Sequence, residues 1–154
     1  MPFHELGFSD VAAYQAAGNV TFRSADRAAV DERRIEAALA DSYGFAAPTF
    51  VRSAAEIESI VASEPFADHD LVGTSGKIQV TFLRAPVPPD RTAAVLALVP
   101  PEDRVAVAGR QWYWLPVEGV STSAVPVGQI ERLLGEMTMR TLGTVARMYA
   151  KFEH

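Results

Sequence analysis

The order of the apolar patterns in the second half of the chain is the strongest constraint on its fold. Ile78, Val80 and Phe82 alternate with polar residues, which is typical of a strand with one buried face. The segments that follow are a helix at 90–98, strands at 105–108 and 111–117, a helix at 126–134, a strand at 137–139 and a terminal helix. Strand, helix, strand, strand, helix, strand is the split-βαβ or ferredoxin-like order.

The first half of the chain repeats this order without its opening strand. The predicted elements are a hairpin of 11–15 and 20–23 through Gly18-Asn19, a helix from Asp26 to about Asp41, a strand at Pro48–Arg52 and a helix after the capping box Ser53–Glu56. We therefore predict an α+β fold of two ferredoxin-like (split βαβ) α/β sandwich halves, the first lacking its opening strand. The halves are residues 1–66 and 78–154, and the aperiodic segment 67–77 is the predicted linker.

Charge and cysteine content narrow the classes of partner. The 14 Lys and Arg residues against 19 Asp and Glu give a net charge of −5, so nucleic acid is a poor default partner. The absence of cysteine excludes disulfides and thiolate chemistry. The longest apolar stretch, near Ala93–Val99, is too short to cross a bilayer. We expect a soluble cytoplasmic protein that does not bind membranes.

Motifs for catalysis and for metal or phosphate binding are incomplete. Asp68-His69-Asp70 is the one His/Asp cluster, and it lacks the paired spacing of known metal sites. Gly73–Lys77 departs from a phosphate loop because Ile78 stands where Ser or Thr would bind magnesium. Ser121 and Ser123 do not belong to a nucleophile elbow. We predict no catalytic residues, no metal and no cofactor.

The aromatic stretch Trp112-Tyr113-Trp114 raises the possibility of base stacking on a sheet. In a strand, Trp112 and Trp114 point to one face and Tyr113 to the other, so at least one set should pack under helices. Together with the negative charge, this favours a protein that does not bind nucleic acid.

Arginines at or beside predicted strand ends form the candidate ligand site. Arg140 is the strongest candidate, because it precedes a helix start, where backbone N–H groups favour anions. With Asn19, Thr138 and Arg110 it is the predicted binding site for a small anionic ligand. The competing interpretation is that these arginines are solvated or pair with nearby carboxylates, as scattered surface arginines usually do.

Several stretches resemble one bacterial family. LGFSDVAAYQAAGNVTFRS is similar to the hallmark stretch of domain-of-unknown-function family 1697. The stretches YGFAAPTFVRSAAEIESIVASEPF, KIQVTFL, AVAGRQWYW and TMRTLGTVARM follow in the expected order, from about Glu5 to Met148. The resemblance implies two α/β sandwich units of ferredoxin-like type and carries no established activity.

The chain also departs from the family pattern. It has no counterpart of the opening apolar strand and its Gly-rich turn, so the resemblance implies an N-terminally truncated, divergent member. Ala16-Ala17 replaces Gln-Ser before Gly18-Asn19, and residues 121–125 have lost a lysine. Thr138, Arg140 and Thr144 are retained. If these polar positions build a family site, this chain holds only part of it.

The missing strand should be replaced by another strand. The first strand of a ferredoxin-like sheet is central, and an empty slot would leave roughly four to six buried backbone groups unpaired, at about 1–3 kcal/mol each. The strand at Pro48–Arg52 could close up beside 20–23, or a strand from the second half could fill the slot. A second copy of the chain could also supply it, and we predict a homodimer.

Two functions are compatible with these observations. The first is a non-catalytic structural or interaction module whose family site has decayed. The second is a small-anion or nucleotide-binding protein, with or without enzymatic activity, whose site lies in the cleft between the halves.

Overall fold

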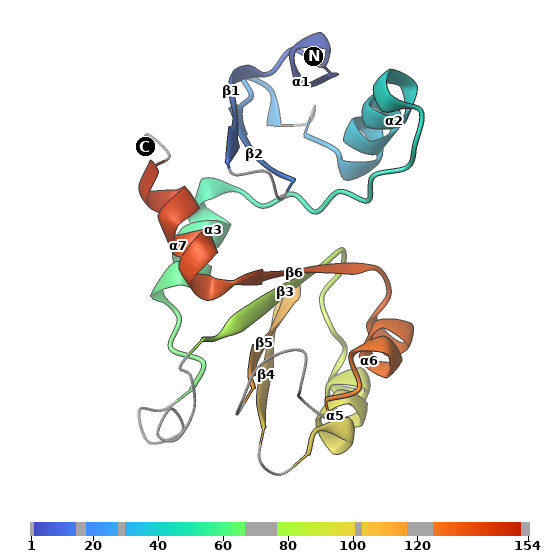
Figure 1. The fold of residues 1–154 in the computed structure, drawn as a ribbon, viewed down its shortest axis with the longest axis vertical. Helices are drawn as coiled ribbons and strands as arrows, with labels where there is room; N and C mark the ends of the chain where they lie inside the picture. Colours follow the sequence, from blue (N-terminus) through green and yellow to red (C-terminus); the bar gives the residue numbers. More distant parts are fainter. Residues whose placement is uncertain are drawn as a thin grey trace. The chain divides into compact units, whose positions relative to one another are not determined.

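The computed structural model describes residues 2–14, 18–27, 30–66, 77–100, 103–116 and 125–151. This part of the chain is α+β, with six helices and six strands in two small sheets. It divides into two compact units, one ending at Ser53 and one spanning Ala54–Lys151 (Figure 1). The predicted linker lies outside the described residues except for Lys77, so the division into 1–66 and 78–154 stays a prediction.

The first unit is a hairpin packed against two helices. Its elements are α1 (Pro2–Glu5), β1 (Ser9–Tyr14), β2 (Asn19–Arg23) and α2 (Glu32–Tyr43). The strands are antiparallel, with Ala13 opposite Val20, which confirms the predicted hairpin. Phe3, Phe8 and Ile35 form the buried core, against which Val20 and Phe22 of β2 pack. The alternating apolar residues of β2 therefore face this core.

Helix α2 begins later than the sequence pattern predicted. Its N-cap is Asp31, whose carboxylate accepts hydrogen bonds from the N–H groups of Arg33 (2.8 Å) and Arg34 (3.3 Å). Asp26 instead belongs to a turn in which the Ser24 hydroxyl donates to the Asp26 carbonyl at 2.7 Å. The predicted start at Asp26 is wrong, because α2 begins at Glu32 and its N-cap is Asp31.

The predicted strand at Pro48–Arg52 is wrong as well: these residues form no strand. Two backbone N–H groups that would enter a ladder donate to glutamates of α2. Thr49 donates to the Glu36 carboxylate at 3.2 Å, and Val51 donates to the Glu32 carboxylate at 2.6 Å. Carboxylates thus replace strand partners along this segment, and Pro48 has no N–H to contribute.

Neither repair from within the chain is present in the described residues. The segment 48–52 does not join β2, and the four strands of the second unit form a sheet of their own. Within the described part of the chain β2 pairs with β1 alone. Both expectations fail for the same reason: each candidate strand already has its hydrogen-bond partners elsewhere.

The second unit contains one four-stranded antiparallel sheet with helices on both faces. Its elements are α3 (Ala54–Ala62), β3 (Gln79–Leu83), α5 (Pro89–Leu98), β4 (Arg104–Ala108), β5 (Gln111–Leu115), α6 (Val127–Leu134), β6 (Met137–Thr141) and α7 (Leu142–Lys151). The strand order is β4-β5-β3-β6. The element order predicted for residues 78–151 is confirmed, with boundaries shifted by at most two residues at each end. Gly109 has a φ of +59°, as the predicted turn of the hairpin requires.

Strand register assigns each residue of the sheet to one of two faces. Trp112 lies opposite Thr81 and Val107, and this face packs against α5 and α6 through Val95 and Ile130. Trp112 and Trp114 are both 0% exposed. The two indoles are therefore core residues, and neither offers a stacking surface for a nucleic-acid base.

The other face carries Tyr113, with Val80 and Ala106 opposite it. Helices α3 and α7 contact each other, as Figure 1 shows, and Ile60 of α3 and Val145 of α7 are buried. Partial burial and, next, the charge of the Glu58 carboxylate on α3 raise the pKa of Tyr149 on α7.

Candidate ligand pocket

Two of the four predicted site residues meet on β6. The guanidinium of Arg140 donates from Nη1 to the Thr138 hydroxyl and to the Met139 carbonyl, each at 2.8 Å. Both side chains lie on the Tyr113 face of the sheet, because Thr138 is opposite Phe82 and Arg140 is opposite Val80. They are two residues apart in one strand, so the alternation of a strand places them together.

Arg110 has a carboxylate partner. Its Nη2 lies 2.8 Å from Oε2 of Glu56 on α3, with the two side chains 28% and 45% exposed. The same guanidinium donates to the Arg84 carbonyl at 3.5 Å. Arg110 therefore links the β4–β5 turn to α3, which is the competing interpretation made from the sequence.

Asn19 belongs to the first unit, where it opens β2 opposite Tyr14 and is 9% exposed. The other three predicted residues belong to the second unit. A single site that unites all four residues stays a prediction.

The two threonines at the β6–α7 junction have a structural role. The Thr141 hydroxyl accepts a hydrogen bond from the Thr144 N–H at 3.1 Å and lies 2.8 Å from the Thr144 hydroxyl. Arg147 donates to the same Thr144 hydroxyl at 3.2 Å. Thr141 thus caps the first turn of α7, and Thr144 completes a chain of polar contacts along that turn.

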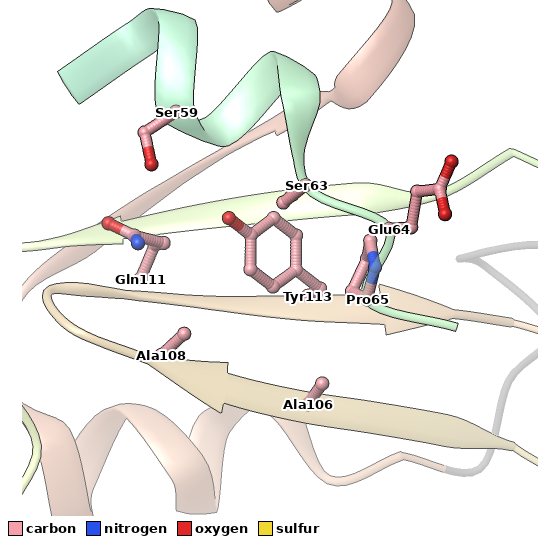
Figure 2. Close-up of a pocket in the computed structure, with 8 residues that line it drawn as sticks. All are labelled: Ser59, Ser63, Glu64, Pro65, Ala106, Ala108, Gln111 and Tyr113. Carbon is pink, nitrogen blue, oxygen red and sulfur yellow. The ribbon is translucent and has the colours of Figure 1, made fainter. Parts of the chain in front are cut away.

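A pocket of about 230 Å³ lies on the Tyr113 face of the second sheet (Figure 2). The end of α3 and the residues after it form one wall, and β4 and β5 form the floor. Its lining residues are Ser59, Ser63, Glu64, Pro65, Ala106, Ala108, Gln111 and Tyr113. The small side chains of Ala106 and Ala108 on β4 lie beside the larger Tyr113 and Gln111 of β5 (Figure 2). This difference in size leaves the pocket between the strands and the end of α3.

Tyr113 is the buried polar residue of this pocket. Its side chain is only 3% exposed, and its hydroxyl points toward the α3 wall, between Gln111 and Ser63 (Figure 2). Within the described part of the chain this hydroxyl has no hydrogen-bond partner. Sequence alternation placed Tyr113 opposite the tryptophan face, but the pocket itself depends on α3, which comes from an earlier part of the chain.

Among the described residues that line the pocket, Glu64 is the only charged one, and its carboxylate lies at the rim, pointing away from Tyr113 (Figure 2). No group of three His, Cys, Asp or Glu residues suited to a metal ion occurs among the described residues. The candidate Asp68-His69-Asp70 lies outside those residues, as do Ser121 and Ser123. In the same part of the chain, no helix is long and apolar enough to cross a membrane.

Comparisons with known proteins agree with the resemblance seen in the sequence. A search of curated proteins finds no match. The fold is similar to that of the conserved bacterial protein SP0830 from Streptococcus pneumoniae, with a TM-score of 0.70 and 17% sequence identity, over 97% of this chain and 85% of that one. The model of the family described as "Protein of unknown function (DUF1697)" matches residues 2–113. The chain therefore belongs to the DUF1697 family.

Proposed function

We propose that the protein is a non-catalytic interaction module, and that a second copy of the chain pairs with β2. The observation that carries this proposal is the two-stranded sheet of the first unit, in which β2 pairs with β1 alone among the described residues. A two-stranded hairpin is marginal by itself, and further strands stabilise it. Neither of the two replacements considered within the chain is present in the described residues, and this supports the third, a second copy.

The sequence of β2 suits pairing with itself around a two-fold axis at Thr21. Antiparallel pairing of two β2 strands at that residue places Val20 opposite Phe22 of the partner subunit, on the face that packs against Phe3 and Phe8. The apolar core of one copy would then continue into the other, at roughly 0.2–1 kcal/mol for each apolar cross-strand pair. The two Arg23 side chains would lie about 13 Å apart, at opposite ends of the paired strands, so they would not repel each other strongly.

The alternative function, a small-anion or nucleotide site built on Arg140 and Arg110, has less support. Arg110 is paired with Glu56, and Arg140 is bound to the Thr138 hydroxyl and the Met139 carbonyl. An incoming anion would have to compete with these contacts. The contacts support a structural role for both arginines.

The finer fold assignment belongs to the same proposal. In the second unit, the order strand, helix, strand, strand, helix, strand and the antiparallel arrangement β4-β5-β3-β6 support a ferredoxin-like sandwich. The first unit would be the same fold reduced to its two middle strands.

Light scattering during gel filtration tests the pairing. The wild-type chain should be a dimer at high micromolar concentration. Thr21→Lys and Thr21→Glu should each be monomeric, because like charges would face each other across the axis at a cost of roughly 1 kcal/mol each. An equimolar mixture of the two variants should restore the dimer, since opposite charges then meet.

The matched control is Ser9→Lys, an exposed position on the neighbouring strand β1, which should leave the dimer intact. A monomeric wild-type chain would refute the pairing. The pairing would also be refuted if Thr21→Lys and Thr21→Glu both remained dimeric, because the interface would then lie elsewhere.

A further inference from the structure

We propose that the outer edge of β4 binds an extended segment of another protein, which adds a fifth strand to the sheet of the second unit. The segment has apolar residues on one face and a basic residue between them on the other. This surface belongs to the second unit and does not depend on pairing through β2. Three features support it: the outward-facing backbone of β4, the closed opposite edge of the sheet, and the charge beside β4.

The backbone groups of two valines in β4 point away from the sheet. A two-residue turn joins β4 to β5, so the pair that closes it, Ala108 and Gln111, exchanges hydrogen bonds. Bonded and non-bonded pairs alternate along an antiparallel ladder, so Ala106 also bonds to β5, whereas Val105 and Val107 direct their N–H and C=O groups outward. Within the described part of the chain, nothing donates to or accepts from these four groups.

Strand β4 also lacks the features that usually protect an edge strand. Natural sheets blunt their edges with proline, internal charges, bulges or very short strands. The β4 sequence Arg-Val-Ala-Val-Ala contains no proline, has its one charge at the first residue, and pairs with all five residues of β5 in a regular register. An edge of this kind is a template for a further strand.

The opposite edge of the sheet, on β6, is closed by a side chain. The Leu142 N–H donates to the Ile78 carbonyl at 2.8 Å, and the alternation of the ladder then directs the Met139 carbonyl away from β3. Nη1 of Arg140 donates to that carbonyl at 2.8 Å. A strand arriving at β6 would have to displace this contact, whereas a strand arriving at β4 displaces no contact to a described residue.

One face of the added strand would extend the apolar core. The side chains of Val105 and Val107 pack against the cluster that contains Trp112 and Trp114. A residue opposite each valine lies on the same face of the sheet. The partner should therefore have β-branched apolar residues at two positions separated by one residue, because such side chains pair well across strands.

The residue between these two lies on the other face, beside Ala106 and the pocket shown in Figure 2. Glu64 at the rim is the only charged residue among the described residues that line the pocket, and none of the described cations pairs with it. The chain as a whole has a net charge of −5. Both charges favour Lys or Arg at this central position. Arg104, the exposed first residue of β4, favours an acid opposite it on the same face.

The peptide Thr-Val-Lys-Val-Glu has this pattern for antiparallel pairing with β4. With blocked ends and a fluorescent label, it should show a rise in anisotropy when the full chain is added. The matched control peptide Thr-Val-Glu-Val-Lys exchanges the two charges and keeps the composition. It should bind about threefold more weakly, because its acid faces Glu64 and its lysine faces Arg104. Glu64→Gln should narrow the difference between the two peptides.

Methylation of the peptide nitrogens tests strand addition itself. N-methylation of either valine removes an N–H group that faces β4, and should weaken binding about fivefold, the effect of one hydrogen bond. N-methylation of the lysine is the control, because its N–H points away from β4 and its loss should leave binding unchanged. The protein is the same in each titration, so no variant has to refold.

The inference is overturned if the lysine peptide does not bind at protein concentrations on the order of 1 mM. It is also overturned if methylated valine and methylated lysine weaken binding equally, or if the charge-exchanged peptide binds as tightly. Occupation of β4 by a second copy of the chain would overturn it too: self-association would persist in Thr21→Lys, and peptide binding would fall as the protein concentration rises. Light scattering of the wild-type chain and the Thr21 variants tests β2, so the two proposals can fail separately.

Discussion

Replacing Thr81 by valine should stabilise the second unit. Thr81 is 0% exposed, and its hydroxyl has no hydrogen-bond partner, although the residue sits in the central strand β3 between Trp112 and Met139. A buried hydroxyl without a partner costs about 1–3 kcal/mol. Valine has nearly the same shape and removes that cost while keeping the branched side chain that a strand favours.

The expected gain can be measured by urea unfolding. A gain of about 1–2 kcal/mol with a slope of about 1–3 kcal/mol per molar urea raises the midpoint by roughly 0.3–2 M. Both tryptophans of the chain, Trp112 and Trp114, are buried in the second unit, so their fluorescence reports this unit alone. The slope should not change, because the substitution leaves the surface exposed on unfolding almost the same.

The matched control is Thr138→Val on the neighbouring strand β6. The Thr138 hydroxyl accepts a hydrogen bond from Arg140 at 2.8 Å, so its removal should lower the midpoint. The two substitutions are chemically identical and should act in opposite directions. A lower midpoint for Thr81→Val would refute the reasoning, because it would mean that the Thr81 hydroxyl has a partner such as a buried water.

Two further predictions concern a helix cap and a tyrosine. Asp31→Ala removes the N-cap of α2 and should destabilise the first unit by about 1 kcal/mol, whereas Asp31→Asn keeps a capping oxygen and should have little effect; this is measured by thermal unfolding followed by circular dichroism. Equal losses for the two variants would contradict this capping role. The pKa of Tyr149 is raised in the folded state by partial burial and by Glu58, so the stability it contributes is present below the unfolded pKa near 10 and is lost as pH rises through the folded pKa. Ultraviolet titration should therefore show one late-ionising tyrosine that disappears in Tyr149→Phe, and an unchanged titration in that variant would assign the late phenol elsewhere.

Local patterns were sufficient to predict most of the second unit. The alternation around Val80 placed β3, although both faces of this strand are buried and the predicted single buried face is wrong. The same rule put Trp112 and Trp114 on one face. These features depend on a single strand and its period of two, and that information is contained in a few adjacent residues.

Features that depend on distant residues were harder to predict. The segment 48–52 has the composition of a strand, but a strand needs a neighbouring strand as its hydrogen-bond partner. The N–H groups of this segment donate to glutamates of α2 instead. Asp26 and Asp31 are equally good caps by residue type, and local sequence could not choose between them. The pocket requires α3 to lie over β4 and β5, which no spacing along the chain encodes.

The glutamate contacts of α2 have a consequence for which positions can vary. Glu32 and Glu36 lie one helical turn apart and hold the main chain of residues 49 and 51, whatever side chains those two positions carry. The backbone path of residues 49–51 is therefore determined by side chains of α2, the helix that precedes this segment. Random mutagenesis should find that the shape of this segment tolerates exchange at position 49 but is lost when either acid of α2 becomes alanine.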